Sequence, residues 1–105
     1  MFSRRERLPT PRLPATAWTI QFPYFTIRVT QNNKSHNRYA IIVGTAVDRR
    51  ATIRNLLRRR CRAVLRAWPG GSADVVVTLK RASATAPRRE LIAALTTARK
   101  AAINH

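Results

Sequence analysis

The stretch from Arg49 to Arg66 carries eight arginines and no acidic residue, and it limits the possible folds of the chain more than any other feature. At 100° per residue its apolar side chains fall on one stripe, which consists of Ile53, Leu57, Cys61, Val64 and Trp68. Four arginines form an i, i+4 ladder on the other side, with Asn55 and Arg59 beside it: Arg54, Arg58, Arg62 and Arg66. The pattern predicts an amphipathic helix over 49–67, with Asp48 as its N-cap.

Residues 18–30 predict an extended segment, because apolar and polar side chains alternate along it. The apolar face consists of Phe25, Ile27 and Val29. The polar face consists of Tyr24, Thr26, Arg28 and Thr30. We expect Pro23 to mark a bend or the start of the strand, since proline cannot donate to a strand ladder.

Three further elements complete the expected order of strand, strand, helix, strand, helix. They are a strand over 38–43, a nearly all-apolar central strand over 74–79 and a helix over 88–102 that follows Pro87. The last helix is expected to bury Leu91, Leu95 and Ala98. We therefore predict an α+β fold in which a small sheet of three to four strands packs with two main helices.

The first 17 residues predict an irregular basic arm. Pro9, Pro11 and Pro14 exclude a regular helix from residue 9 to residue 14, because proline lacks the backbone donor and clashes with the preceding turn. At 105 residues, the chain has room for one domain. We expect that domain to span residues 18–105.

The charge of the chain favours a polyanionic partner. Lys+Arg number 21 against 4 Asp+Glu, for a formal net charge of +17, and such an excess costs stability through self-repulsion. Most of the basic residues are arginine, which grips phosphate through a bidentate fork and stacks on bases, so we expect a nucleic acid. The sequence shows no membrane-spanning apolar run and no secretory leader, and its one cysteine excludes an internal disulfide. We therefore expect a cytoplasmic protein.

The sequence offers no arrangement for bond-breaking chemistry by the chain itself. The carboxylates and histidines are dispersed, with no two sharing a motif: Glu6, Asp48, Asp74, Glu90, His36 and His105. Zinc-ligand spacing and a phosphate-binding glycine loop are absent from the sequence, which has only three glycines. We expect no catalytic residue, no metal bound by the protein, and a small buried thiol at Cys61.

The segment Arg54-Asn55-Leu56-Leu57-Arg58-Arg59-Arg60-Cys61-Arg62 resembles the signature helix of the ribonuclease P protein family. Arg54 and Asn55 match the first two positions of its Arg-Asn-Arg pattern, and the later basic positions are matched by Arg58, Arg59 and Arg62. The strand that ends near Val43, the segment PYFTIRV and the downstream DVVV strand also resemble the family. The resemblance covers roughly residue 22 to the C-terminus.

Several positions depart from the family pattern. Leu56 stands at the second arginine of Arg-Asn-Arg, Ala63 replaces an acidic or polar residue, and Thr45 and Ala46 replace a lysine pair. The proline-rich arm stands in place of most of the family's first helix. The resemblance therefore does not extend to the leader contacts that the family makes through that helix.

The resemblance implies a protein subunit that assists a catalytic RNA, which hydrolyses precursor tRNA with bound Mg²⁺ and removes its 5′ leader. It implies that the helix contacts the catalytic RNA through Arg54, Asn55, Arg58, Arg59 and Arg62. We expect Arg49 and Arg50 to reinforce this contact at the helix start, where the dipole favours phosphate, and Arg66 to extend it along the ladder. A groove on the sheet would hold the single-stranded leader through Tyr24, Thr26, Arg28 and Lys80. The family fold, which is like domain 2 of ribosomal protein S5, also implies a left-handed β-α-β crossover, although about 98% of such crossovers are right-handed.

Two other classes of RNA- or DNA-binding protein fit the charge and size of the chain. One is a ribosomal or other rRNA-binding protein with no role in cleavage, and the other is an architectural DNA-binding protein. Only the Arg-Asn spacing and the flanking strands separate ribonuclease P from the ribosomal alternative. Equal affinity for duplex DNA and structured RNA would favour the architectural class.

Overall fold

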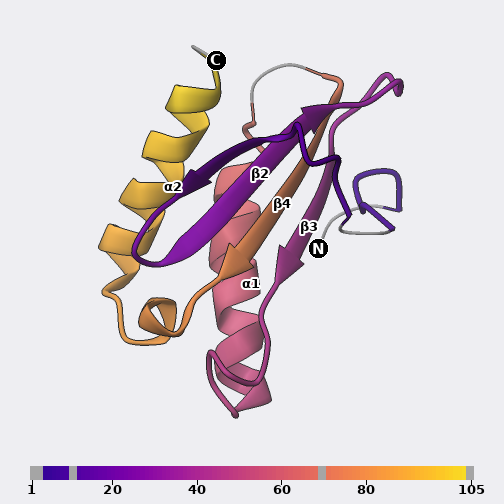
Figure 1. Cartoon of the computed structure of the whole chain (residues 1–105). Coiled ribbons are helices and arrows are strands. Elements are labelled where there is room, and N and C mark those ends of the chain that lie inside the picture. The colour runs from indigo at the N-terminus through magenta and orange to yellow at the C-terminus, as the bar shows by residue number, and fades with distance from the viewer. Residues whose placement is uncertain (1–3, 10–11, 69–70, 104–105) are drawn as a thin grey trace.

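The computed structural model describes residues 4–9, 12–68 and 71–103, which form a four-stranded sheet with two helices packed on one face (Figure 1). In chain order the elements are β1 (Trp18–Gln21), β2 (Phe25–Gln31), β3 (Arg38–Ile42), α1 (Ala51–Leu65), β4 (Ala73–Leu79), the short 3-10 helix η1 (Arg81–Ala84) and α2 (Arg88–Ile103). The predicted α+β class, with three to four strands and two main helices, is confirmed.

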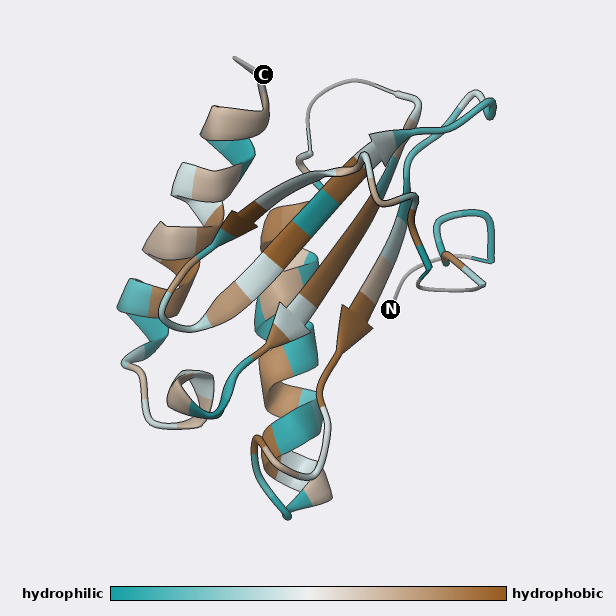
Figure 2. Ribbon diagram, in the orientation of Figure 1, coloured by the Kyte–Doolittle hydropathy of each residue, from teal (hydrophilic) through white to brown (hydrophobic). Residues whose placement is uncertain are grey.

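The sheet has the order β1-β2-β4-β3. β2 pairs antiparallel with both β1 and β4, whereas β3 pairs parallel with β4. The predicted central position of the 74–79 strand is therefore correct, and β4 is the most continuously hydrophobic strand in Figure 2. Such a strand belongs inside a sheet, because both of its edges and one or both faces are covered.

The hydrophobic core lies between the sheet and the two helices. Alternation along the strands sends every second side chain to the helices, and the register places Phe25 opposite Leu79 and Ile27 opposite Val77. All four are buried, and they pack in one cluster with Leu57, Cys61, Leu91 and Leu95 from the helices. This core cluster packs one face of α1 against the sheet, so the opposite face of the helix points away from the core.

The opposite side of the sheet, which we call the open face, is covered by neither helix (Figure 1). Strand alternation and register place these side chains on it: Thr19, Gln21, Thr26, Arg28, Thr30, Arg38, Ala40, Ile42, Asp74, Val76 and Thr78. Most are polar, whereas the helix-facing set is apolar. The pattern is that of a sheet with one packed and one solvated face.

The connection from β3 through α1 to β4 is a left-handed crossover. In Figure 1, β3 and β4 both run downward, α1 lies behind the sheet, and β4 lies to the left of β3. A right-handed connection through a helix behind the sheet would place the second strand on the right. The handedness implied by the family resemblance is thus the one observed, against the general preference for right-handed connections.

The predicted elements differ from the observed ones mainly at their ends. The extended segment 18–30 is two strands, β1 and β2, joined by a turn at residues 22–24 in which the Phe22 N–H donates to the Phe25 carbonyl at 2.8 Å. Pro23 lies in that turn, so the predicted bend is confirmed. α1 covers 51–65 rather than 49–67, and η1 was not predicted.

Asp48 is not the N-cap of α1, contrary to the prediction. The N-cap is Arg50, whose extended backbone begins the helix without a side-chain cap. The Asp48 carboxylate instead accepts the Arg50 backbone N–H at 2.8 Å and ion-pairs with the Arg50 guanidinium. Asp48 therefore stabilises the turn that precedes α1 and does not cap the helix itself.

The described part of the arm follows the outer edge of β3. The Tyr39 N–H donates to the Glu6 carbonyl at 2.6 Å, and the Leu8 N–H donates to the Tyr39 carbonyl at 2.8 Å. Arg7 and Tyr39 form a parallel bridge. Two backbone hydrogen bonds thus hold this otherwise irregular segment beside α1 and β3.

Candidate nucleic-acid interface

Most arginines on and beside α1 lie on the sides of the helix that face away from the core, whereas the Nε atom of Arg60 is buried. Leu57, Cys61, Val64 and Leu65 are its buried residues, and Ile53 and Trp68 also contact the core. The predicted stripe is therefore confirmed. Asn55, Arg59 and Arg66 are exposed, while Arg54, Arg58 and Arg62 are half-buried along one flank. We call the outward set the arginine face: Arg49, Arg50, Arg54, Asn55, Arg58, Arg59, Arg62 and Arg66.

Two members of the arginine face also hold the start of the helix together. The Arg54 guanidinium donates to the backbone carbonyls of Asp48 at 3.0 Å and Arg49 at 2.8 Å. Hydrogen bonds from Arg50 lower the pKa of Asp48 to about 2, so this carboxylate is ionised at neutral pH. Arg54 therefore has a local structural role that spacing along the helix did not reveal.

Arg58, Arg59 and Arg62 are largely unoccupied by the rest of the described chain. Arg58 donates to the Asn55 side-chain oxygen at 2.9 Å and to the Val43 carbonyl at 3.4 Å, contacts that use part of its five-donor guanidinium. The side chains of Arg59 and Arg62 make no hydrogen bond or ion pair with any other described residue. The helix sequence contains no carboxylate that could neutralise them.

This arrangement is suited to binding phosphate. Guanidiniums repeated along an exposed helix flank repel one another in the free chain, at about 0.2–0.5 kcal/mol for each like-charged i, i+4 pair. A polyanionic backbone removes that repulsion and accepts bidentate hydrogen bonds. Neutralisation of phosphates also releases counterions, which makes such binding steeply dependent on salt.

The residues predicted to form the leader groove are only partly brought together. Thr26 and Arg28 lie on the open face of β2, where Arg28 donates to the Pro14 carbonyl at 2.8 Å and to the Thr19 hydroxyl at 3.4 Å. Tyr24 precedes β2 rather than lying in it, and its hydroxyl donates to Glu90 at 2.9 Å. That hydrogen bond raises the pKa of Tyr24 above its usual value. Lys80 follows β4, and its ammonium donates to the Phe22 carbonyl at 2.9 Å.

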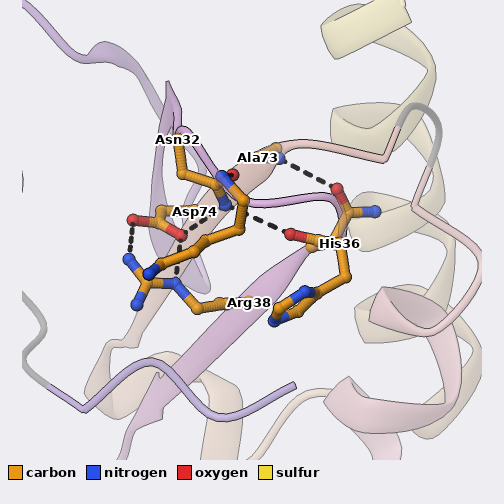
Figure 3. Close-up of polar contacts among 7 residues, drawn as sticks. Asn32, His36, Arg38, Ala73 and Asp74 are labelled. Atoms are coloured by element: carbon orange, nitrogen blue, oxygen red, sulfur yellow. Dashed lines mark hydrogen bonds and ion pairs between the residues drawn. The ribbon is translucent and has the colours of Figure 1, made fainter. Parts of the chain in front are cut away.

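A polar cluster at one end of the open face was missed by sequence reasoning (Figure 3). Arg38 donates to both Asp74 carboxylate oxygens, at 2.9 and 2.8 Å, and the Asn32 amide donates to the same carboxylate at 2.8 Å. Burial acts to raise the pKa of Asp74, but these hydrogen bonds outweigh it and the pKa is lowered. The cluster links the β2–β3 loop to the start of β4. The sequence pattern predicted only that Asp74 begins a strand and not that its carboxylate has these partners.

Two other arginines outside the predicted set lie near the arginine face. Arg81 of η1 donates to the Ala46 carbonyl at 3.3 Å and lines a pocket with Arg49 and Arg50. Arg7 of the arm lines a second pocket with Arg58 and Arg62. Basic charge was the only sequence signal for either residue, because their approach to α1 depends on long-range packing.

The described residues include one buried free cysteine and no cluster of metal-ligating side chains. Burial raises the pKa of Cys61 to about 12, so the thiol is not a ready nucleophile, and its predicted buried position is confirmed. Within residues 4–9, 12–68 and 71–103, no three His, Cys, Asp or Glu side chains gather as metal ligands would. None of the helices in this part of the chain has the length and apolar character needed to cross a membrane.

Comparison with known proteins identifies the family. Residues 11–102 match the family model described as Ribonuclease P. The fold is similar to that of the Staphylococcus aureus RNase P protein, with a TM-score of 0.73, 18% identity and coverage of 82% of this chain and 81% of that one. The RNase P protein from Thermotoga maritima gives a TM-score of 0.62 at 22% identity, covering 78% and 84% of the two chains.

Among curated proteins, none matches the chain. The family match covers far more than half of the sequence and includes both helices and all four strands, and it does not favour the ribosomal alternative. The chain therefore belongs to the ribonuclease P protein family and has the role of the protein subunit of ribonuclease P.

Proposed function

We propose that the arginine face of α1 docks on the catalytic RNA of ribonuclease P, while the open face of the sheet contacts the 5′ leader of precursor tRNA. The RNA carries out the hydrolysis with Mg²⁺ that it holds itself, and the protein stabilises the assembly. We further propose that the enzyme works in the cytoplasm. The observation that carries the proposal is that Arg59 and Arg62 on the outer side of α1 make no side-chain hydrogen bond or ion pair with another described residue.

The position of α1 supports the assignment of this helix to the catalytic RNA. Its inner side is fully used by the core, so its outer side can bind a large partner without rearrangement of the fold. Arg59 and Arg62 have their whole guanidiniums available, and Arg49 is exposed beside the helix start. The N-terminal end of a helix favours phosphate through its free backbone N–H groups and dipole.

The open face is suited to a single strand rather than a duplex. Its accessible residues include the small side chains of Thr26, Ala40 and Thr78, and Arg28 adds a positive charge near the middle. A single-stranded leader can lay its backbone along such a surface and its bases against side chains. Tyr24 and Lys80 lie next to each other where β2 begins and β4 ends, and the Lys80 N–H donates to the Tyr24 carbonyl at 2.8 Å. The Tyr24 hydroxyl is directed to Glu90 of α2 and not to the open face.

The division of labour follows from the chemistry that the chain contains. Asp48, Asp74 and Glu90 each accept a hydrogen bond within the chain, and no two of them interact with each other. Hydrolysis of a phosphodiester needs a group that activates water and one that stabilises the leaving oxygen. We assign both tasks to the RNA and its Mg²⁺, and we assign to the protein only RNA contacts.

Cleavage of a precursor tRNA by the catalytic RNA, with and without the chain, tests this function. At low Mg²⁺ the chain should raise the cleavage rate, because its arginines replace part of the charge neutralisation that the metal otherwise supplies. Replacement of both Arg58 and Arg62 by alanine should weaken binding of the catalytic RNA and reduce the salt slope by about one to two units.

The matched control is Arg88→Ala with Arg89→Ala, which removes the same charge from exposed positions at the start of α2. These changes should leave the affinity for the catalytic RNA closer to that of the unaltered chain. An absence of any rate gain at low Mg²⁺ would contradict the proposed function. Equal losses for the α1 and α2 pairs would contradict the assignment of the arginine face.

A further inference from the structure

A groove separates the arm from α1 along the outer edge of β3. Its walls are Arg7 and Leu8 on the arm and Arg58 and Arg62 on α1, and its floor includes Ala40 and Ile41. The backbone hydrogen bonds at Glu6, Leu8 and Tyr39 fix the arm wall in place. Because those bonds use backbone groups, the Arg7 side chain is not needed to hold the arm.

The charge of this groove is unbalanced within the described chain. The Arg7 and Arg62 side chains make no hydrogen bond or ion pair with other described residues, and Arg58 retains unused donors. Glu6 is the only acid among the first 17 residues. Even if the negative charge of Glu6 is counted in full, the guanidiniums of Arg7, Arg58 and Arg62 leave the groove with a net positive charge.

The groove also has an apolar component. Leu8 and Ile41 are half-buried, so each leaves part of an apolar side chain accessible beside the guanidiniums. A duplex would offer phosphates, sugars and base edges but not the flat faces of its bases, because these are stacked inside. An unstacked nucleotide offers a phosphate for the arginines and a sugar and base for the apolar surface, as in other single-strand sites.

We propose that this groove holds an unpaired nucleotide segment of the catalytic RNA, with its phosphates between Arg7 and the Arg58–Arg62 flank and its sugar and base against Leu8 and Ile41. The arm would thereby form the second wall of the RNA site. The inference rests on the proposed function, since it assumes that α1 faces the catalytic RNA. Arg7 and Leu8 precede the region matched by the family model, so the family match does not assign them this role.

The test compares Arg7→Ala with Arg12→Ala in binding of the catalytic RNA across a salt series. Both arginines are exposed and lie in the arm, but Arg12 does not line the groove. Arg7→Ala should weaken binding several-fold and lower the salt slope by about one unit, because one phosphate contact is lost. Arg12→Ala should have a clearly smaller effect.

A double-mutant cycle tests whether the two walls hold the same segment. The effects of Arg7→Ala and Arg62→Ala should be less than additive, because loss of either wall releases the nucleotide from the other. Arg7→Ala and Arg66→Ala should be additive, since Arg66 does not line the groove. Additive effects for Arg7 and Arg62 would overturn the shared site.

Proximity provides a readout that does not depend on affinity. A hydroxyl-radical reagent attached at Pro9→Cys on the arm and at Ala63→Cys on α1 should cleave the same nucleotides, while the reagent at Ala15→Cys should cleave elsewhere. The buried Cys61 should not take up the reagent in the folded protein. Separate cleavage patterns for Pro9 and Ala63 would overturn the proposal.

The outcomes separate this inference from the function on which it rests. If Arg58→Ala with Arg62→Ala weakens binding while Arg7→Ala matches Arg12→Ala, the groove proposal fails and the proposed function stands. If the chain does not stimulate cleavage and no arginine variant changes binding of the catalytic RNA, the proposed function itself fails. Circular dichroism of each variant should show an unchanged fold, because the altered side chains lie outside the core.

Discussion

At the scale of single residues, Asp74 is the most enclosed carboxylate among the described residues, with 7% of its surface exposed. Its partners Arg38 and Asn32 come from β3 and from the loop before it, 36 and 42 positions away in the sequence. Local pattern could place Asp74 at a strand start but could not supply these partners, because they depend on the parallel register of β3 with β4. The register sets Arg38 directly beside Asp74.

We predict that Asp74→Asn destabilises the fold at neutral pH by roughly 1.5–3 kcal/mol, because it removes a charged acceptor and leaves the Arg38 guanidinium without its ion-pair partner. Chemical denaturation at pH 7 measures the change in free energy of unfolding. Asp48→Asn serves as the control, since its partner Arg50 is largely exposed and the change should be smaller. Equal losses for the two variants would contradict a special role for the Asp74 cluster.

The pH dependence has a definite sign. Because the pKa of Asp74 is lower in the folded chain than in the unfolded chain, its ionisation contributes stability above the unfolded pKa of about 3.9. That contribution is lost as the pH falls through the folded pKa. The difference in stability between the unaltered chain and Asp74→Asn should therefore shrink as the pH is lowered toward that value.

At the scale of elements, α1 could be predicted because its signal is local. Apolar residues at helical spacing predicted which side of α1 is buried, and the arginines predicted which side faces outward. The predicted N-terminal end of α1 was wrong because it depends on contacts that compete with the helix. Arg50 donates to the Asp48 carboxylate, and Arg54 donates to two backbone carbonyls in the turn before the helix. Similarly, the segment 18–30 could be read as extended, but its division into β1 and β2 depends on cross-strand pairing from Trp18 to Val29.

We predict that Leu57→Ala destabilises the fold by about 2–5 kcal/mol, because Leu57 is 1% exposed and its truncation leaves a cavity between α1 and the sheet. The matched variant on the same helix is Arg59→Ala, which lies on the exposed side and should change the free energy of unfolding by less than about 0.5 kcal/mol. Thermal and urea unfolding measure both. A near-neutral Leu57→Ala would mean that the helix packs less closely than described.

At the scale of the whole molecule, the handedness of the β3–α1–β4 connection is the feature that residue patterns could least reveal. General packing rules favour the opposite hand, and only the resemblance to a family implied the observed one. The composition, by contrast, pointed to a polyanion from the start. The charge excess could not show that the arm pairs with β3 and brings Arg7 toward Arg58 and Arg62, because these residues are far apart in the sequence and meet only in the folded chain.

The net charge of +17 leads to a prediction for the free chain. Its free energy of unfolding should rise with ionic strength, because salt screens the repulsion among exposed arginines, while its affinity for RNA should fall steeply between about 50 and 200 mM salt. Denaturation and RNA binding measured over the same salt series would show the two opposite trends. Stability that falls with added salt would mean that attractive ion pairs, rather than repulsion, dominate the surface.

Arg59→Glu tests the same balance at one position. The new carboxylate would lie three residues from Arg62, so it should stabilise the free helix by about 0.2–0.5 kcal/mol at low salt. The same change should weaken binding of the catalytic RNA more than Arg59→Ala does, because it adds repulsion toward phosphate. A gain in stability together with a loss of affinity would show that the arginine surplus is unfavourable in the free chain and becomes favourable on RNA. A loss of both would instead mean that Arg59 supports the fold, and its place on the arginine face would have to be abandoned.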